Sequence, residues 1–195
     1  MKEIRTADIS ADKPKTTTEN ELVLVGRPIV FDEPTTIRAS FGEYTEIIKR
    51  GALDNADLSD IRLLYNHDSN KLPLARTPKT MSFALDPAGL SMRAILPETE
   101  NGKGVYTAVD RRDLSGMSFA FKVSDGGSHY DAKTNTRTIT KIDKVYEFSI
   151  TPFPAYPQTS LEARSEIEGA KSAVYEEAKQ AAKIKINQIL FKGDK

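Results

Sequence analysis

The chain has 195 residues, enough for one domain with a hydrophobic core and an appended segment. Lysine plus arginine and aspartate plus glutamate balance at 28 each, so no basic excess predicts binding to nucleic acid or to a membrane surface. The lack of cysteine excludes disulfides, thiolate metal ligands and a cysteine nucleophile, and two histidines without an HExxH pair argue against a catalytic zinc site.

The first 20 residues are polar and include a run of lysine, proline and threonine, which predicts a flexible N-terminal arm. The N-terminus is too polar for a signal peptide, and no apolar run approaches the length of a membrane span. We therefore expect the protein in the cytoplasm of the cell that makes it.

Between residues 21 and 151 the patterns are typical of β-strands. Met81, Phe83 and Leu85 alternate up to an Asp-Pro-Ala-Gly turn signal, and alternation resumes at Leu90, which predicts a β-hairpin. A short helix is expected over residues 104–113 and a polar loop over 124–136. The other predicted strands are residues 21–32, 44–48, 61–67, the stretch around Ser118, and 138–150.

Apolar residues recur at helical spacing from Ser165 to Phe191, with alanines and charges between them. This spacing predicts a long amphipathic helix. Two interpretations stay open, a helix packed on the β domain and an exposed arm that binds a partner.

The stretch around Ser118 is the most informative one. Met117, Phe119 and Phe121 fall on one face of the predicted strand, and Ser118 and Ala120 fall on the other. A serine fixed on a strand in this way is a candidate nucleophile if a base is available. The alternative is that it is an ordinary strand serine.

Histidine is the usual base for a serine nucleophile, and the chain offers His67 and His129. His67 ends an apolar strand, whereas His129 lies among polar loop residues, so we favour His67. A histidine at a strand end is also often a structural or solvent-facing residue.

A third group should orient the imidazole. Glu147 lies in an otherwise apolar strand, with Tyr146, Phe148 and Ile150 expected on the opposite face. Asp68 follows His67 directly, so its side chain should point away. The alternative for Glu147 is a cross-strand ion pair with a lysine or arginine.

The order of six segments resembles the prohead (capsid maturation) protease family of tailed bacteriophages. Each segment is short, but together, with the histidine ahead of the serine, they form a specific pattern. In chain order they are residues 26–31, 63–68, 73–76, 86–90, 114–119 and 147–155.

The resemblance implies a mainly β (α+β) fold, a closed β-barrel flanked by helices and distantly similar to the herpesvirus assembly protease. The barrel domain would span residues 21–163, between the flexible arm 1–20 and an amphipathic helical tail 164–195. His67 matches the family's catalytic histidine, Ser118 its nucleophile and Glu147 an acidic third member. The herpesvirus relatives use a second histidine as third member, which keeps His129 open. The sequence departs from the family at Ala120, where glycine is frequent.

The implied function is a serine endopeptidase that cleaves scaffold and capsid-protein segments, and itself, in the host cytoplasm inside the assembling prohead. No cofactor, nucleic acid or membrane is implied, and a homo-oligomer is left open. Backbone N–H groups near Ser118, or Arg76, are candidates for the oxyanion hole.

Two other functions compete with this one. The first is a non-enzymatic capsid-assembly scaffold or binding module with a protease-like barrel, which would contact capsid protein through the C-terminal helix. The second, a hydrolase of small esters, fits poorly because the chain has neither a Gly-x-Ser-x-Gly elbow nor alternating strands and helices.

Overall fold

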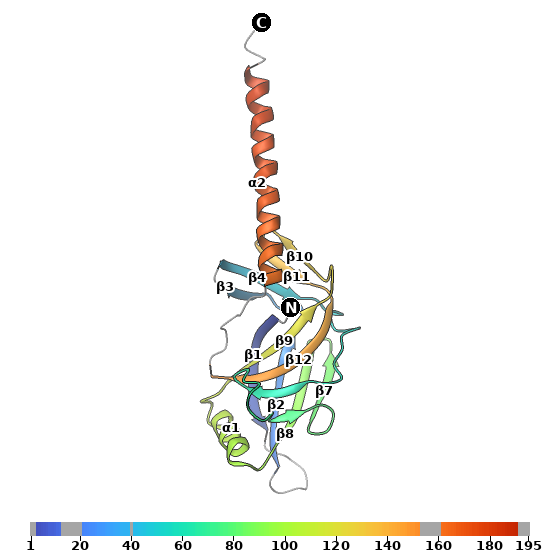
Figure 1. Ribbon diagram of the computed structural model, residues 1–195, viewed down its shortest axis with the longest axis vertical. Helices are drawn as coiled ribbons and strands as arrows, with labels where there is room; N and C mark the ends of the chain where they lie inside the picture. Colours follow the sequence, from blue (N-terminus) through green and yellow to red (C-terminus); the bar gives the residue numbers. More distant parts are fainter. Residues whose placement is uncertain (1–2, 13–20, 40, 153–160, 191–195) are drawn as a thin grey trace.

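The computed structural model describes residues 3–12, 21–39, 41–152 and 161–190. Within these ranges the protein is mostly β-structure with two helices (Figure 1). The elements, in chain order, are β1 (Glu3–Asp12), β2 (Leu22–Val30), β3 (Thr35–Ala39), β4 (Gly42–Ile48), β5 (Arg62–Tyr65), β6 (Ala75–Arg76), β7 (Met81–Asp86), β8 (Gly89–Leu96), α1 (Glu100–Asp110), β9 (Gly116–Val123), β10 (Ser128–Asp131), β11 (Thr136–Ile139), β12 (Ile142–Thr151) and α2 (Leu161–Leu190).

Eight strands form a large sheet in the order β6-β5-β12-β9-β1-β2-β8-β7, and four form a small sheet in the order β10-β11-β4-β3. The pairs β5–β12 and β4–β11 are parallel, and the other ladders are antiparallel. The small sheet lies at the end of the body from which α2 projects, and α1 lies at the opposite end (Figure 1).

The expected closed barrel is wrong, because the large sheet is open. Strands β6 and β7 are its edges, and no ladder joins them in the described ranges. The sheet curls enough to bring β6 against β8, but β6 has only the two residues Ala75 and Arg76, too few to continue a ladder. Alternation in a sequence predicts the face that each side chain takes; it does not predict whether the two edges of a sheet meet.

The strand predicted around Ser118 is present as β9, in the middle of the large sheet. Phe119 and Phe121 are buried on one face, and their rings stack with centroids 4.9 Å apart. Each buried phenylalanine contributes roughly 1.5–3 kcal/mol relative to an exposed one, so the face opposite Ser118 holds β9 firmly in the core. The predicted hairpin is also present, as β7 and β8.

Three local expectations differ from the structure. Residues 3–12 form β1, which pairs with β9 and β2, where a flexible arm was expected; the lysine- and threonine-rich run lies outside the described residues. Residues 128–131 form β10, where a loop was expected. The first helix spans residues 100–110 and not 104–113, because the Thr99 hydroxyl accepts a hydrogen bond from the Gly102 N–H and caps it. The division into three parts stays a prediction.

The sequence does not predict β1, because two of its charged side chains, Glu3 and Arg5, are buried and paired. Glu3 and Arg5 lie on one face of β1. The guanidinium of Arg5 donates to both carboxylate oxygens of Glu46 in β4, through Nε and Nη2. Arg137 of β11, 1% exposed, donates to Glu3 at 2.6 Å and to Glu46 at 3.1 Å. Since ionised groups are rarely buried unless paired, a hydropathy pattern assigns such a strand to the solvent.

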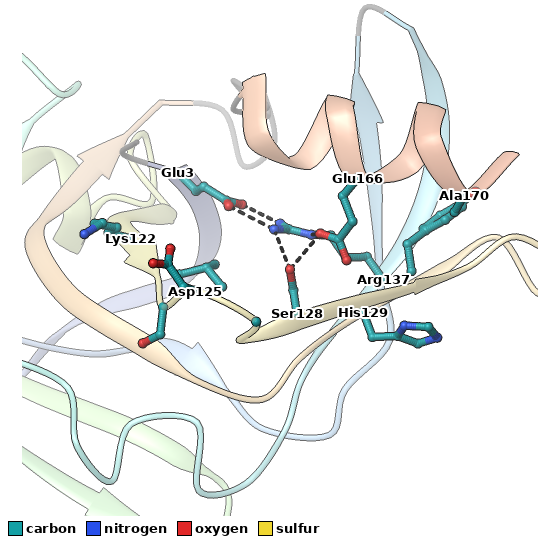
Figure 2. A pocket seen from close by; sticks show the side chains of 12 residues that line it. Glu3, Lys122, Asp125, Ser128, His129, Arg137, Glu166 and Ala170 are labelled. Carbon is teal, nitrogen blue, oxygen red and sulfur yellow. Dashed lines mark hydrogen bonds and ion pairs between the residues drawn. The ribbon is translucent and has the colours of Figure 1, made fainter. Parts of the chain in front are cut away.

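The same charge network reaches α2. Glu166 accepts hydrogen bonds from Arg137 Nε at 3.0 Å and from the Ser128 hydroxyl at 2.7 Å (Figure 2). Burial alone would lower the pKa of the Arg137 guanidinium. The hydrogen bond and the charge of Glu3, together with the charges of Glu46 and Glu166, outweigh burial and raise the pKa above its ordinary value. A cavity of about 510 Å³ opens beside these groups. The network thus joins β1, the small sheet and the start of α2.

Among the described side chains of α2, residues 165–185, the buried contact with the body lies near the beginning of the helix. Ile167 is buried against Ile37, Tyr44 and Tyr130 of the small sheet, whereas every side chain from residue 171 to 185 is exposed. Of the two interpretations of this helix, the described part fits the projecting arm (Figure 1). No helix in the described ranges is both long and apolar enough to cross a membrane.

We predict that Arg137→Met lowers the free energy of unfolding by about 3–5 kcal/mol, because Glu3, Glu46 and Glu166 lose their shared buried counter-charge. Urea unfolding followed by circular dichroism measures this. The matched control is Arg38→Met, whose ion pair with Glu43 is exposed and should change stability by no more than about 1 kcal/mol. Equal effects of the two changes would contradict the assigned role of the network.

We also predict that a chain shortened to residues 1–171 keeps the stability of the full chain. Shortening to residues 1–164 removes Glu166 and Ile167 and should cost roughly 2–5 kcal/mol, the range for deleting a large buried aliphatic side chain. Thermal melts of the two shortened chains make the comparison. If both shortened chains have the melting temperature of the full chain, the start of α2 does not contribute to the stability of the body.

Candidate active site

His67 lies in a turn that directly follows β5. This strand runs parallel to β12, and the pairing continues one residue beyond its end, where the Asn66 N–H donates to the Ile150 carbonyl at 2.9 Å. Asn66 and His67 then adopt the left-handed region, with φ of 53° and 58°. Residues other than glycine are uncommon there, although asparagine and histidine adopt this region more readily than most, and such conformations recur at functional sites. The predicted strand over residues 61–67 is therefore two residues too long at its end, because Asn66 and His67 form a turn after Tyr65.

The turn brings the imidazole of His67 to the carboxylate of Glu147. His67 Nδ1 lies 2.7 Å from Glu147 Oε1. The side chain of Glu147 is 3% exposed and that of His67 is 25% exposed, so the contact lies at the border between core and solvent. A carboxylate can only accept, so Nδ1 carries the proton, and a neutral imidazole then leaves the lone pair of Nε2 free.

A β-bulge in β12 puts Glu147 on this face. Val145 pairs with Phe121, but Glu147 already pairs with Ala120, so Tyr146 is an extra residue in the ladder. The extra residue reverses the alternation. Val145 and Phe148 therefore both face the core, and the assignment of Tyr146 to one regular face with Phe148 is wrong at this position.

Ser149 is a member of the cluster that the sequence reading did not find. Its hydroxyl donates to Glu147 Oε2 at 3.0 Å and accepts from the His67 N–H at 3.2 Å. Its position two residues after Glu147 predicts a shared face, but the bond to the His67 backbone depends on the turn, which no sequence pattern announces.

Ser118 lies directly opposite Ser149 in the antiparallel ladder of β9 and β12. Directly opposed residues share a face, with Cβ atoms about 4.5–5.5 Å apart, so Ser118 and Glu147 are on the same face of the sheet. The Ser118 side chain is fully buried, and its Oγ has no hydrogen-bond partner among the described residues. Such a buried hydroxyl is uncommon and costs about 1–3 kcal/mol, which makes it a candidate functional group.

The structure thus brings His67 and Glu147 into contact and places Ser118 on their face. The Ser118 hydroxyl makes no bond to His67 here, and such bonds are often loose without substrate. With a protonated Nδ1 held by Glu147 and a free Nε2, the cluster has the parts for general-base activation of a serine.

The other sequence candidates lie elsewhere. His129 is exposed on β10 and points away from the Arg137 and Glu166 side chains (Figure 2). Asp68 accepts from the Asn70 N–H at 3.0 Å within its own turn. Arg76 is exposed and donates to Asp60 at 2.7 Å.

In the part of the chain that the structure describes, no group of three or more histidine, aspartate or glutamate side chains is arranged to hold a metal ion.

Comparison with known proteins gives two matches. A family model described as caudovirus prohead serine protease matches residues 7–173. The prohead protease of Enterobacteria phage HK97 is 26% identical over 151 residues, which cover 75% of this chain and 65% of the phage protein. The match therefore spans about two thirds of the length of that relative. No solved structure matches the chain significantly.

Proposed function

The chain belongs to the caudovirus prohead serine protease family, and we propose that it is a serine endopeptidase that cuts scaffold and capsid-protein segments, and itself, inside the assembling prohead in the host cytoplasm. Family membership and the relative's name support the reaction class. The observation that carries the proposal is the contact between His67 and Glu147 on the face that holds Ser118.

In the proposed mechanism Ser118 is the nucleophile, His67 is first the base and then the acid, and Glu147 orients His67. Ser118 Oγ attacks the peptide carbonyl carbon while its proton moves to His67 Nε2. The Nδ1–H of His67 stays bonded to Glu147, which stabilises the imidazolium. His67 then protonates the leaving amine, and water repeats the sequence on the acyl-enzyme. A positioned general base of this kind typically contributes about 10²–10⁴-fold.

Two observations favour the competing function, a non-enzymatic capsid-assembly scaffold or binding module. Ser118 is 0% exposed, and residues 171–185 of α2 present a long uncovered surface. A fluorophosphonate, which reacts covalently with an activated serine hydroxyl, separates the two functions. The protease should be labelled at Ser118, as mapped by mass spectrometry of peptides. A protein that stays unlabelled fits the binding module, and labelling at Ser149 would identify a different nucleophile.

We predict that Ser118→Ala abolishes fluorophosphonate labelling and lowers peptide cleavage on the order of 10⁴–10⁶-fold, because no other group replaces the nucleophile. Intact-mass measurement should show no self-processing. The matched control is Ser115→Ala, an exposed serine three residues earlier, which should behave as the unchanged protein. Processing that persists in Ser118→Ala would contradict the assignment.

We further predict that His67→Ala equals Ser118→Ala in severity, since residues that act as a unit are strongly non-additive. His129→Ala should cost less than about 10-fold, because an exposed imidazole on the small sheet has no part in proton transfer from Ser118. Both variants are compared by labelling rate and by self-processing. The reverse ranking would move the base to His129.

A further inference from the structure

We propose that Ser149 is a positioning residue of this site, whose hydroxyl fixes the carboxylate of Glu147 and the turn of His67 at the same time. The proposal rests on the proposed function, since it assigns a role within that catalytic cluster. Ser149 makes no hydrogen bond to the Ser118 hydroxyl; it acts through its two neighbours.

The first contact restricts Glu147. One carboxylate oxygen lies 2.7 Å from His67 Nδ1, and the other accepts from the Ser149 hydroxyl at 3.0 Å. The terminal torsion of a glutamate is broad, so a single bond leaves the carboxylate free to rotate. With a partner on each oxygen, the plane of the carboxylate is set, and Oε1 is aimed at the imidazole.

The second contact restricts the backbone of His67. The Ser149 oxygen accepts from the His67 N–H at 3.2 Å, at a residue with φ of 58°. A left-handed histidine needs support from its surroundings, and this bond supplies part of it. One oxygen atom therefore ties the backbone of the base to the group that orients its ring.

A neighbouring hydroxyl shows that these bonds are not a general property of β12. Thr151 lies two residues further along the same strand and on the same face, and it is also buried. Its Oγ1 has no hydrogen-bond partner among the described residues. Thr151→Val is therefore a matched control, because it deletes a buried hydroxyl from the same strand without touching Glu147 or His67.

The first arm of the experiment measures reaction with an alkyl fluorophosphonate in the full chain. Ser149→Ala should lower the maximal inactivation rate on the order of 10²-fold, the cost of a small misplacement of reacting groups, and leave the probe's half-saturation concentration unchanged. Glu147→Gln serves as the reference for a disturbed orienting group, and Thr151→Val should react as the unchanged protein. An unchanged rate in Ser149→Ala overturns the proposal.

The second arm does not depend on activity. In a Ser118→Ala background, proton NMR follows the Nδ1–H of His67, whose bond to Glu147 places it downfield of ordinary N–H signals. Ser149→Ala should broaden or shift this resonance, and Thr151→Val should not. If Ser149→Ala does not fold, Ser149→Cys keeps the approximate shape with a weak donor and replaces it in both arms.

The two arms separate the two proposals. An unlabelled wild-type protein whose Nδ1–H resonance moves in Ser149→Ala contradicts the protease function but supports the positioning role. A labelled protein in which neither rate nor resonance responds to Ser149→Ala keeps the protease function and overturns the positioning role.

Discussion

The candidate site depends on the register of β12 between its two neighbours. On one side β12 is parallel to β5, whose end carries the His67 turn, and on the other it is antiparallel to β9, which carries Ser118. A slip of one residue sends every side chain of a strand to the opposite face. The bulge at Tyr146 shifts the register of β12 by one residue between Val145 and Glu147. It lets Val145 and Phe148 both fill the core while Glu147 and Ser149 face the serine.

The buried charges have a different task, which is to hold the two sheets and α2 together. Arg5 and Arg137 pair with the carboxylates of Glu3, Glu46 and Glu166, and these five residues come from β1, β4, β11 and α2. Buried ion pairs of this kind often add little net stability compared with apolar packing, since desolvation offsets the attraction. In the observed arrangement each of these five side chains has at least one partner of opposite charge. Because β1 lies beside β9, that arrangement also fixes the strand next to Ser118.

Sequence reasoning succeeded where a pattern has a local cause. The alternation in β9 and the turn signal between β7 and β8 predicted those strands, and helical spacing predicted α2. It failed where the cause is a distant partner. The charges of Glu3 and Arg5 are typical of a solvated segment until Arg137 and Glu46 are placed around them, and the alternation of the strands does not predict that β6 and β7 stay unpaired edges. Residue patterns and the family resemblance together indicated His67, Ser118 and Glu147, whereas the turn, the bulge and the bonds of Ser149 arise only from the folded arrangement of β5 and β12.

The burial of Ser118 places a demand on any reaction at this site, because a peptide bond must reach a hydroxyl that solvent does not. Strand β9 cannot supply the access, since Phe119 and Phe121 anchor its other face in the core and ladders flank it on both sides. A substrate must therefore reach Ser118 from the face of the sheet that also carries Glu147 and Ser149. The turn of His67 is the part of the cluster outside any ladder, and its side chain already reaches solvent. In the proposed enzyme the serine is therefore fixed in the core, and the substrate must approach it from the side of the His67 turn, which the bonds to Ser149 and Glu147 hold in place.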